Sequence, residues 1–227
     1  MDPSVCLLEL LGVLVSVGAW ICSLATTVMS TWLTLSTELL PAESYELGLW
    51  ETCVVQDHGI LECRPYDSLL GLPPDIKLAR ILMCAAVATG LLGVILAIPG
   101  IYWVNVCDQG PEGMRVKRLM KMLGGVLCLV TGILGLIPVS YIAHLTVIRF
   151  FDESVPSVVP RWEFGDALFC GWLAGFLHLV AGFLLVTSCM CQREEPCARR
   201  RPIPLQRRHA RAHRTSMPHK KRSMEYV

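Results

Sequence analysis

Long runs of apolar residues alternate with shorter polar segments along this chain. Four runs are long enough to cross the hydrocarbon core of a membrane, which takes about 20 residues of helix. We therefore predict four membrane-spanning helices, because no fifth run of this length is present. The predicted spans are residues 5–29, 78–102, 119–143 and 167–191.

The polar segment 30–77, between the first two spans, is far longer than the about 12–15 residues that an unstructured connection usually has. It contains short stretches rich in β-branched and aromatic residues, a composition typical of strands. We therefore predict a small folded sheet in this segment. The candidate strands are "TWLTLS" (31–36), "YELGLW" (45–50), "TCVVQ" (52–56) and "ILEC" (60–63).

Two cysteines fit a hairpin formed by the last two of these strands. Pairing Cys53 with Cys63 places Val55 opposite Leu61 and leaves residues 57–59 as a three-residue turn that ends in glycine. So small a sheet buries little apolar surface, so we predict that a disulfide stabilises it in an oxidising compartment. The alternative is a pair of buried free thiols.

Composition and charge support the membrane assignment and suggest its orientation. The residues are 53% hydrophobic and the mean hydropathy is +0.52, which is too apolar for an ordinary soluble domain. Basic residues mark the cytoplasmic ends of membrane spans. They gather in the predicted cytoplasmic loop 103–118, at Arg115, Lys117 and Arg118, and in the tail 192–227, which holds 11 of the 20 Lys and Arg residues.

This charge distribution predicts that both termini are cytoplasmic and that loops 30–77 and 144–166 are extracellular. Residues 1–191 then form one four-span domain, followed by a basic disordered tail. An alternative is that the first apolar run is a cleaved signal peptide, but its start, "MDPSVCLLEL", lacks the basic region that such peptides carry.

Several residues around this hairpin resemble the signature of the claudins, the four-span proteins of tight junctions. The signature consists of Trp32, Gly48-Leu49-Trp50, Cys53, Cys63 and Arg80. The similarity continues in the glycine pair at 124–125, in "PVSY" of the third span and in "RWEFGDALFCGW" (161–172). It covers nearly all of residues 5–191.

The resemblance implies both a fold and a function. The fold would be a membrane-embedded, left-handed bundle of four helices topped by a small extracellular antiparallel sheet, to which the second loop adds a fifth strand. The function would be adhesion at the tight junction of the plasma membrane, by polymers that form a paracellular barrier or channel. No enzymatic constellation, cofactor motif or nucleic-acid site competes with this interpretation.

The resemblance also assigns roles to individual residues. Arg64, directly after the second cysteine, would face the paracellular pathway and favour anions, although Glu62 would lie on the same strand face. Phe150, Phe151 and Pro156 would belong to the loop that contacts the opposite cell, and Arg80 would anchor the sheet. The expected partners are other claudins, in the same membrane and across the gap.

The predicted cytoplasmic side carries two further signals. Tyr226 and Val227 end the chain with a hydrophobic residue and a carboxylate, a pattern that PDZ domains of zonula-occludens scaffolds bind. Cys107, Cys189 and Cys191 flank spans on the predicted inner side, which suits palmitoylation, with unmodified buried thiols as the alternative. Membrane lipids are therefore also expected partners.

Three other features have structural interpretations. Glu9 and Asp166 lie near span ends and are expected to reach the interface. His178, in the fourth span, is expected to be a hydrogen-bonded packing residue. The small residues of "GWLAG" (171–175) are expected to pack within the bundle, with self-association through the same face as the alternative. The alternative to a junctional protein is an accessory subunit of a channel or receptor, or a peripheral-myelin-type protein, with the same extracellular signature.

Overall fold

The computed structural model describes residues 3–36, 44–55, 60–68, 71–99, 111–152 and 161–198. The chain divides into two compact units, Met1–Gln192 and Arg193–Val227. The first unit contains everything described below except the end of the last helix.

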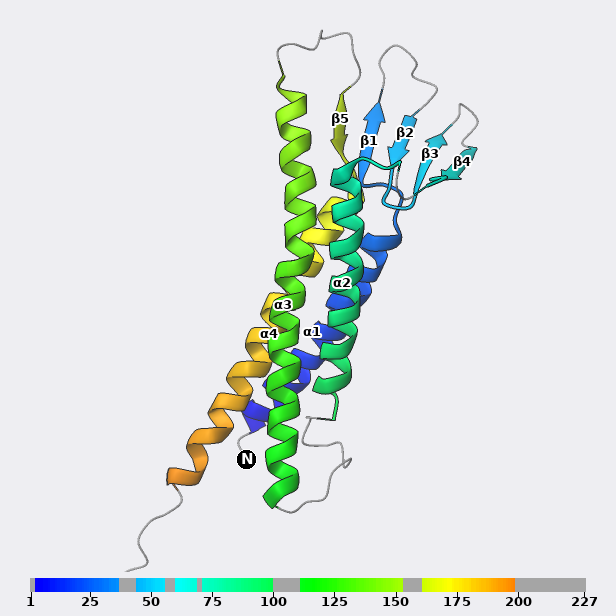
Figure 1. Cartoon of the computed structure of the whole chain (residues 1–227). Helices are drawn as coiled ribbons and strands as arrows, with labels where there is room; N and C mark the ends of the chain where they lie inside the picture. Colours follow the sequence, from blue (N-terminus) through cyan, green and yellow to red (C-terminus); the bar gives the residue numbers. More distant parts are fainter. Residues whose placement is uncertain are drawn as a thin grey trace, which may run out of the picture. The chain divides into compact units, whose positions relative to one another are not determined.

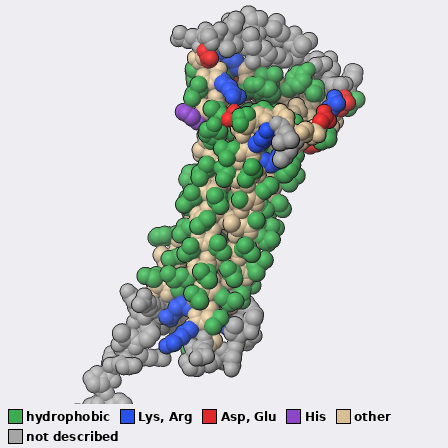
Figure 2. All heavy atoms as spheres, viewed as in Figure 1, with side chains coloured by type: hydrophobic (Ala, Val, Ile, Leu, Met, Phe, Trp, Pro, Cys, Tyr) green, Lys and Arg blue, Asp and Glu red, His purple; other side chains and the backbone are tan. Residues whose placement is uncertain are grey.

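Four long helices form the bulk of the first unit (Figure 1). Each is long and apolar enough to cross a membrane, and each contains most of one predicted span. In Figure 2 the visible flank of the helices is covered by apolar side chains, while charged side chains gather at its two ends. The helices are α1 (Pro3–Val28), α2 (Pro74–Ala97), α3 (Pro111–Phe150) and α4 (Asp166–Ala198).

The helices extend beyond the apolar runs that predicted them. The clearest case is α3, whose 40 residues include 111–118 and 144–150, both expected to lie in loops. Hydropathy marks only the part of a helix that lipid can surround, whereas backbone hydrogen bonds continue the helix into polar sequence. The last residues of the predicted second span, 100–102, lie outside the described residues.

A five-stranded antiparallel sheet stands at the end of the bundle where α2 begins and α3 ends (Figure 1). Its order is β4-β3-β2-β1-β5, so the fifth strand that the resemblance implied is present at one edge. The register pairs Cys53 with Cys63 and Val55 with Leu61, as predicted, while residues 57–59 lie outside the described residues. The strands are β1 (Leu33–Ser36), β2 (Ser44–Leu47), β3 (Glu51–Val55), β4 (Leu61–Pro65) and β5 (Trp162–Phe164).

Close approach of small residues holds α4 against α3. A Cβ atom added at Gly175 would lie 2.6 Å from Cγ of Leu136, and one added at Gly171 would lie 2.6 Å from Cγ2 of Val139. Only glycine therefore allows this spacing. The "GWLAG" segment therefore packs within the bundle, as expected. In lipid no hydrophobic effect drives helices together, so they associate through close van der Waals contact.

Glu9 departs from the sequence-based expectation. It does not reach the interface: its side chain is 1% exposed and forms an ion pair with Lys121 of α3, which is 3% exposed. A buried carboxylate is tolerated when a cation and hydrogen bonds compensate it. The sequence offered one weak signal, opposite charges placed in two otherwise apolar runs.

His178 is fully buried in α4, and its Nδ1 lies 2.9 Å from the carbonyl oxygen of Ala174. That contact agrees with the packing role expected for it. Among the residues that the structure describes, Nε2 of the same ring has no hydrogen-bond partner.

Candidate functional site

The sheet is fastened to the end of α1 by two tryptophans. The indole nitrogen of Trp32 donates to the carbonyl oxygen of Thr26 at 2.9 Å, and that of Trp50 donates to the carbonyl oxygen of Thr27 at 2.8 Å. The last four carbonyls of a helix lack partners within the helix. The two indoles therefore cap α1 and fix the sheet to it at the same time.

Gly48 and Leu49 bring the β2–β3 connection down onto the bundle. A Cβ atom at Gly48 would lie 2.7 Å from the Cα atom of Ser30, so the chain passes there only with glycine. Leu49 is 1% exposed and belongs to a buried cluster that includes Trp32, Met83 and Leu168. The connection thus joins the sheet to the helical core.

Arg80 of α2 holds the same connection from below. Its Nε atom donates to the carbonyl oxygen of Leu49 at 3.0 Å, and Nη2 contacts the same oxygen. Its guanidinium also lies over the rings of Trp50, at 4.6 Å, and Tyr66, at 5.7 Å. These contacts give Arg80 the position beneath the sheet that the resemblance implied, and they make the signature residues one anchoring structure.

Tyr66 is a part of this anchor that sequence reasoning missed. Its hydroxyl donates to the carbonyl oxygen of Gly48 at 3.1 Å and lies 3.2 Å from the hydroxyl of Thr52. It follows β4 directly, so the only available signal was an aromatic residue shortly after the second cysteine. That pattern is too common to identify an anchor.

The disulfide between Cys53 and Cys63 joins β3 to the edge strand β4. The ligand atoms of Glu51, Cys53 and Cys63 lie within 4.8 Å of one another, but sulfurs bonded to each other are not the thiolates that bind metals. The two cysteines therefore have a structural role.

Arg64 lies next to the disulfide on β4 and is exposed. Because β4 continues to Pro65, Glu62 and Arg64 point to the same face of the sheet. Among the described residues, no ion pair or hydrogen bond engages the Arg64 side chain. Its charge is therefore presented to solvent, with one carboxylate two positions away.

The tip of α3 carries the aromatic pair predicted for the second loop. Phe151 is 72% exposed and Phe150 is 36% exposed, and their rings pack edge to face at 5.3 Å. With Trp162 and Phe164 of β5, they line a cavity of about 390 Å³. Pro156, the third residue predicted for this loop, lies outside the described residues.

Arg161, which the sequence did not single out, ties this tip to the strand that follows. Its Nη1 donates to the carbonyl oxygen of Phe150, and its guanidinium lies 5.5 Å from the ring centre of the same residue. An arginine at a helix C-terminus satisfies a free carbonyl and interacts favourably with the helix dipole.

The cysteines predicted for acylation have different environments. The thiol of Cys189 is buried between α3 and α4, 3.6 Å from the carbonyl oxygen of Arg118, so a lipid chain on it would separate the helices. Cys191 is exposed. Cys107 and the terminal Tyr226 and Val227 lie outside the described residues.

Together these features define a class: a four-helix membrane protein with a small disulfide-bonded sheet at one end of the bundle. The model of the PMP-22/EMP/MP20/Claudin family matches residues 6–185, and the chain belongs to this family. It is 36% identical to mouse (Mus musculus) claudin-19, over 80% of this chain and 81% of that protein. It is 34% identical to rat (Rattus norvegicus) claudin-3, over 80% and 82% of the two chains.

The chain is also 35% identical to human (Homo sapiens) claudin-19, over 80% of this chain and 81% of that protein. The similarity to claudins supports a role at the tight junction for this multi-pass membrane protein.

Proposed function

We propose that this chain is a structural and adhesion protein of tight junctions that polymerises side by side and sets paracellular permeability. The observation that carries the proposal is the rigid sheet, which two indoles, one arginine and one disulfide hold at the end of the bundle. A surface fixed so firmly to a membrane anchor suits repeated contact between neighbouring molecules. The relatives described above are claudins, which favours this function over that of a channel accessory subunit.

We place the sheet outside the cell and both termini inside. Two observations support this orientation. The disulfide requires an oxidising compartment. The basic residues Arg115, Lys117 and Arg118 lie in α3 at the end far from the sheet, as expected for a cytoplasmic face.

The α3 tip supplies the contact surface in this proposal. Exposed Phe151 stands beside the apolar cavity of about 390 Å³ that Phe150, Trp162 and Phe164 help to line. Exposed aromatic residues beside a cavity are typical of the centres of protein interfaces. Residues 150–151, together with Pro156, would contact other claudins in the same membrane or across the gap.

Arg64 would favour anions in the paracellular pathway. A fixed cation in a narrow aqueous passage attracts anions and repels Na⁺, by about 4 kcal/mol for a bare pair at 4 Å and an effective dielectric of 20. Glu62 on the same face reduces this effect, and salt screens both charges. The preference therefore depends on the difference between two neighbouring charges.

The tail would connect the junction to the cell interior. Tyr226 and Val227 would bind PDZ scaffolds of the zonula-occludens type by adding a strand to the PDZ groove. Exposed Cys191, and Cys107, remain the candidates for palmitoylation, which would hold the cytoplasmic segments at the membrane.

Expression in fibroblasts that lack tight junctions tests the adhesive function. We expect enrichment at contacts between expressing cells and intramembrane strands in freeze-fracture images. The matched variants are Phe151→Ala, which removes the exposed ring, and Phe169→Ala, which removes a ring on α4 that is 54% exposed. Strands that form equally in both variants would reject the α3 tip as the contact surface, and absence of contact enrichment in the wild type would reject the function.

Dilution potentials across an epithelial monolayer test the role of Arg64. Arg64→Asp should shift the potential toward cation preference, Arg64→Gln should shift it less, and Glu62→Gln should shift it toward anions. An unchanged potential in all three variants, at equal surface expression, would reject the assignment of this face to the pathway.

A further inference from the structure

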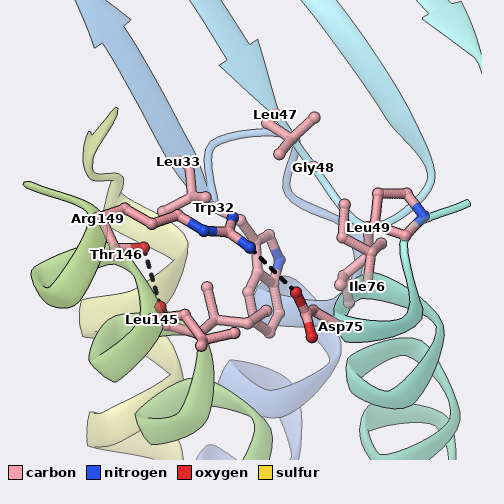
Figure 3. Close-up of a pocket in the computed structure, with 12 residues that line it drawn as sticks. Trp32, Leu33, Leu47, Gly48, Leu49, Asp75, Ile76, Leu145, Thr146 and Arg149 are labelled. Atoms are coloured by element: carbon pink, nitrogen blue, oxygen red, sulfur yellow. Dashed lines mark hydrogen bonds and ion pairs between the residues drawn. The ribbon is translucent and has the colours of Figure 1, made fainter. Parts of the chain in front are cut away.

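A second cavity, of about 110 Å³, lies between the underside of the sheet and the ends of α2 and α3. Figure 3 shows its lining, which combines residues far apart in the chain. Most of the lining side chains are apolar, among them Trp32, Leu49, Ile76 and Leu145. The anchoring contacts described above do not fill this space, and the α3 tip uses the other cavity.

The mouth of this cavity carries one negative and one positive side chain. Oδ2 of Asp75 lies 3.4 Å from Nη2 of Arg149, and the hydroxyl of Tyr141 donates to Oδ1 of Asp75 at 3.2 Å. In Figure 3 the Asp75–Arg149 contact lies in front of Trp32 in that view. The Arg149 side chain is 69% exposed, so it remains accessible to a ligand while it contacts Asp75.

The cavity lies at the depth of lipid head groups. On α2, the uncharged run begins at Ile81, after Arg80, and on α3 it ends at Ile148, directly before Arg149. The α3 run, residues 122–148, is about 40 Å long at 1.5 Å per residue. That length is about the thickness of a bilayer including its head-group layers, which is roughly 40–45 Å. Arg149, at the end of this run, therefore lies at the depth of the head groups of the leaflet on the sheet side.

We propose that this cavity binds a phosphocholine group. The trimethylammonium end enters the apolar cavity beside Trp32 and close to the Asp75 carboxylate, and the phosphate binds the exposed guanidinium of Arg149. An aromatic wall attracts a quaternary ammonium through cation–π interaction, which is the usual way proteins recognise choline. Arginine is well suited to phosphate because its planar fork donates two parallel hydrogen bonds.

The charges at the mouth exclude the competing ligand classes. A purely anionic head group would bring its charge next to Asp75, and a simple cation would bring its charge next to Arg149. An uncharged acyl chain would fill the apolar part but leave the ion pair unused. Only a zwitterion matches both charges, because its phosphate and ammonium are joined by a two-carbon linker and can each lie beside the side chain of opposite charge.

Among zwitterions, the lining favours choline over ethanolamine. A primary ammonium group is strongly hydrated and carries three N–H donors that need acceptors once water is removed. The apolar side chains that dominate this lining supply none. Trimethylammonium has no N–H donor and presents methyl groups that pack against carbon.

Native mass spectrometry of the full chain, released from nanodiscs that contain equal amounts of phosphatidylcholine, phosphatidylethanolamine and phosphatidylglycerol, tests the proposal. We expect one phosphatidylcholine to be retained in clear excess over its share of the bilayer. Retention in proportion to the bilayer, or preference for either other lipid, would overturn the proposal.

Two variants locate the site. Arg149→Gln removes the partner of the phosphate, which all three lipids share, and should reduce the amount of retained phosphatidylcholine by about tenfold, the worth of one charged hydrogen bond. Leu145→Trp fills the cavity and should abolish the choline preference. The control is Arg64→Gln, which removes an exposed arginine outside the cavity and should leave the retained lipid unchanged. Unchanged retention of phosphatidylcholine in both site variants would overturn the assignment, and retention of the Cys53–Cys63 disulfide confirms that each variant has folded.

Free phosphocholine distinguishes the two sources of the group. In a choline-free maltoside detergent, saturation-transfer NMR should detect the choline methyl protons on the wild type and not on Leu145→Trp. A transfer signal on free phosphocholine would show that the head group alone is sufficient for binding. A signal only on a short-chain phosphatidylcholine would identify the leaflet lipid as the ligand. Equal transfer to wild type and Leu145→Trp in both cases would reject the cavity as the site.

Discussion

The sheet and the helical bundle are stabilised by different means, although both belong to one unit of the chain. The sheet has little interior of its own: in β4, every residue except Cys63 is exposed. A disulfide and hydrogen bonds from Trp32, Trp50 and Arg80 hold it in place. The bundle instead relies on tight contact of small residues, as at Gly171 and Gly175.

The difference follows from the two solvents. In water, a sheet this small cannot gain enough from apolar burial, so directed contacts must fix it. In lipid, apolar side chains gain little by leaving the solvent, so close packing must hold the helices together. The ends of the helices lie where lipid gives way to water. At the end of α1, the free carbonyls of Thr26 and Thr27 become attachment points for the sheet.

The largest expected effect on stability concerns the buried Glu9–Lys121 ion pair. This pair is the exception to the comparison, because it is a directed contact inside the closely packed bundle. Lys121→Met leaves the Glu9 carboxylate buried without that cation and should cost about 3–5 kcal/mol of unfolding free energy. Glu9→Leu combined with Lys121→Met should restore most of the loss, because well-packed apolar residues often replace a buried ion pair without cost.

A double-mutant cycle, measured by thermal or denaturant unfolding in detergent, checks this prediction. If each single variant cost less than about 1 kcal/mol, the pair would not contribute to the bundle. If the loss of unfolding free energy in the double variant equalled the sum of the losses in the two single variants, the two residues would not be energetically coupled. Packing alone would then stabilise this part of the bundle.

The second effect concerns the disulfide. Replacing both Cys53 and Cys63 with serine should cost about 3 kcal/mol, the chain-entropy value for a loop of this length. The loss should be local: amide exchange should accelerate in β3 and β4 and stay unchanged in the middle of α3 and α4. Replacement of Cys84, an exposed thiol on α2, with serine is the control. Equal acceleration throughout the bundle would show that sheet and helices unfold as one.

Those parts of the fold that rest on periodicity were predictable from the sequence. Long apolar runs identified four helices, and alternation together with two cysteines identified the β3–β4 register down to the Val55–Leu61 pair. Helix ends were not predictable in this way, because hydropathy does not mark where α3 stops forming backbone hydrogen bonds. The fifth strand followed only from family resemblance, since three residues at 162–164 carry no usable period.

Site geometry was predictable only in part. The signature residues were identified as a set, but their common target, the end of α1 and the β2–β3 connection, depends on tertiary contacts. The Glu9–Lys121 pair and the Arg161–Phe150 contact join residues from different elements. No pattern within one element predicts such contacts.

The third effect tests the arginine that connects the two regions. Arg80→Met should cost about 2 kcal/mol, because the buried carbonyl of Leu49 loses a charged donor and the Trp50 ring loses its cation. Arg80→Lys should recover part of this by restoring the charge. Arg64→Met is the matched control on an exposed arginine. Unfolding curves with equal midpoints for Arg80→Met and Arg64→Met would contradict the anchoring role.

The smallest effect isolates one hydrogen bond between the two regions. Trp50→Phe keeps an aromatic ring beneath Arg80 but removes the indole N–H that caps the carbonyl of Thr27, which should cost about 1 kcal/mol. The control is Trp172→Phe, which removes an indole N–H whose partner is the hydroxyl of Ser140 on α3 instead of a carbonyl at the end of α1. If the cap couples α1 to the sheet, amide exchange should accelerate at the end of α1 and in β3 together in the first variant and in neither place in the second. Acceleration in β3 alone would mean that the ring, not the hydrogen bond, holds the sheet to the helix.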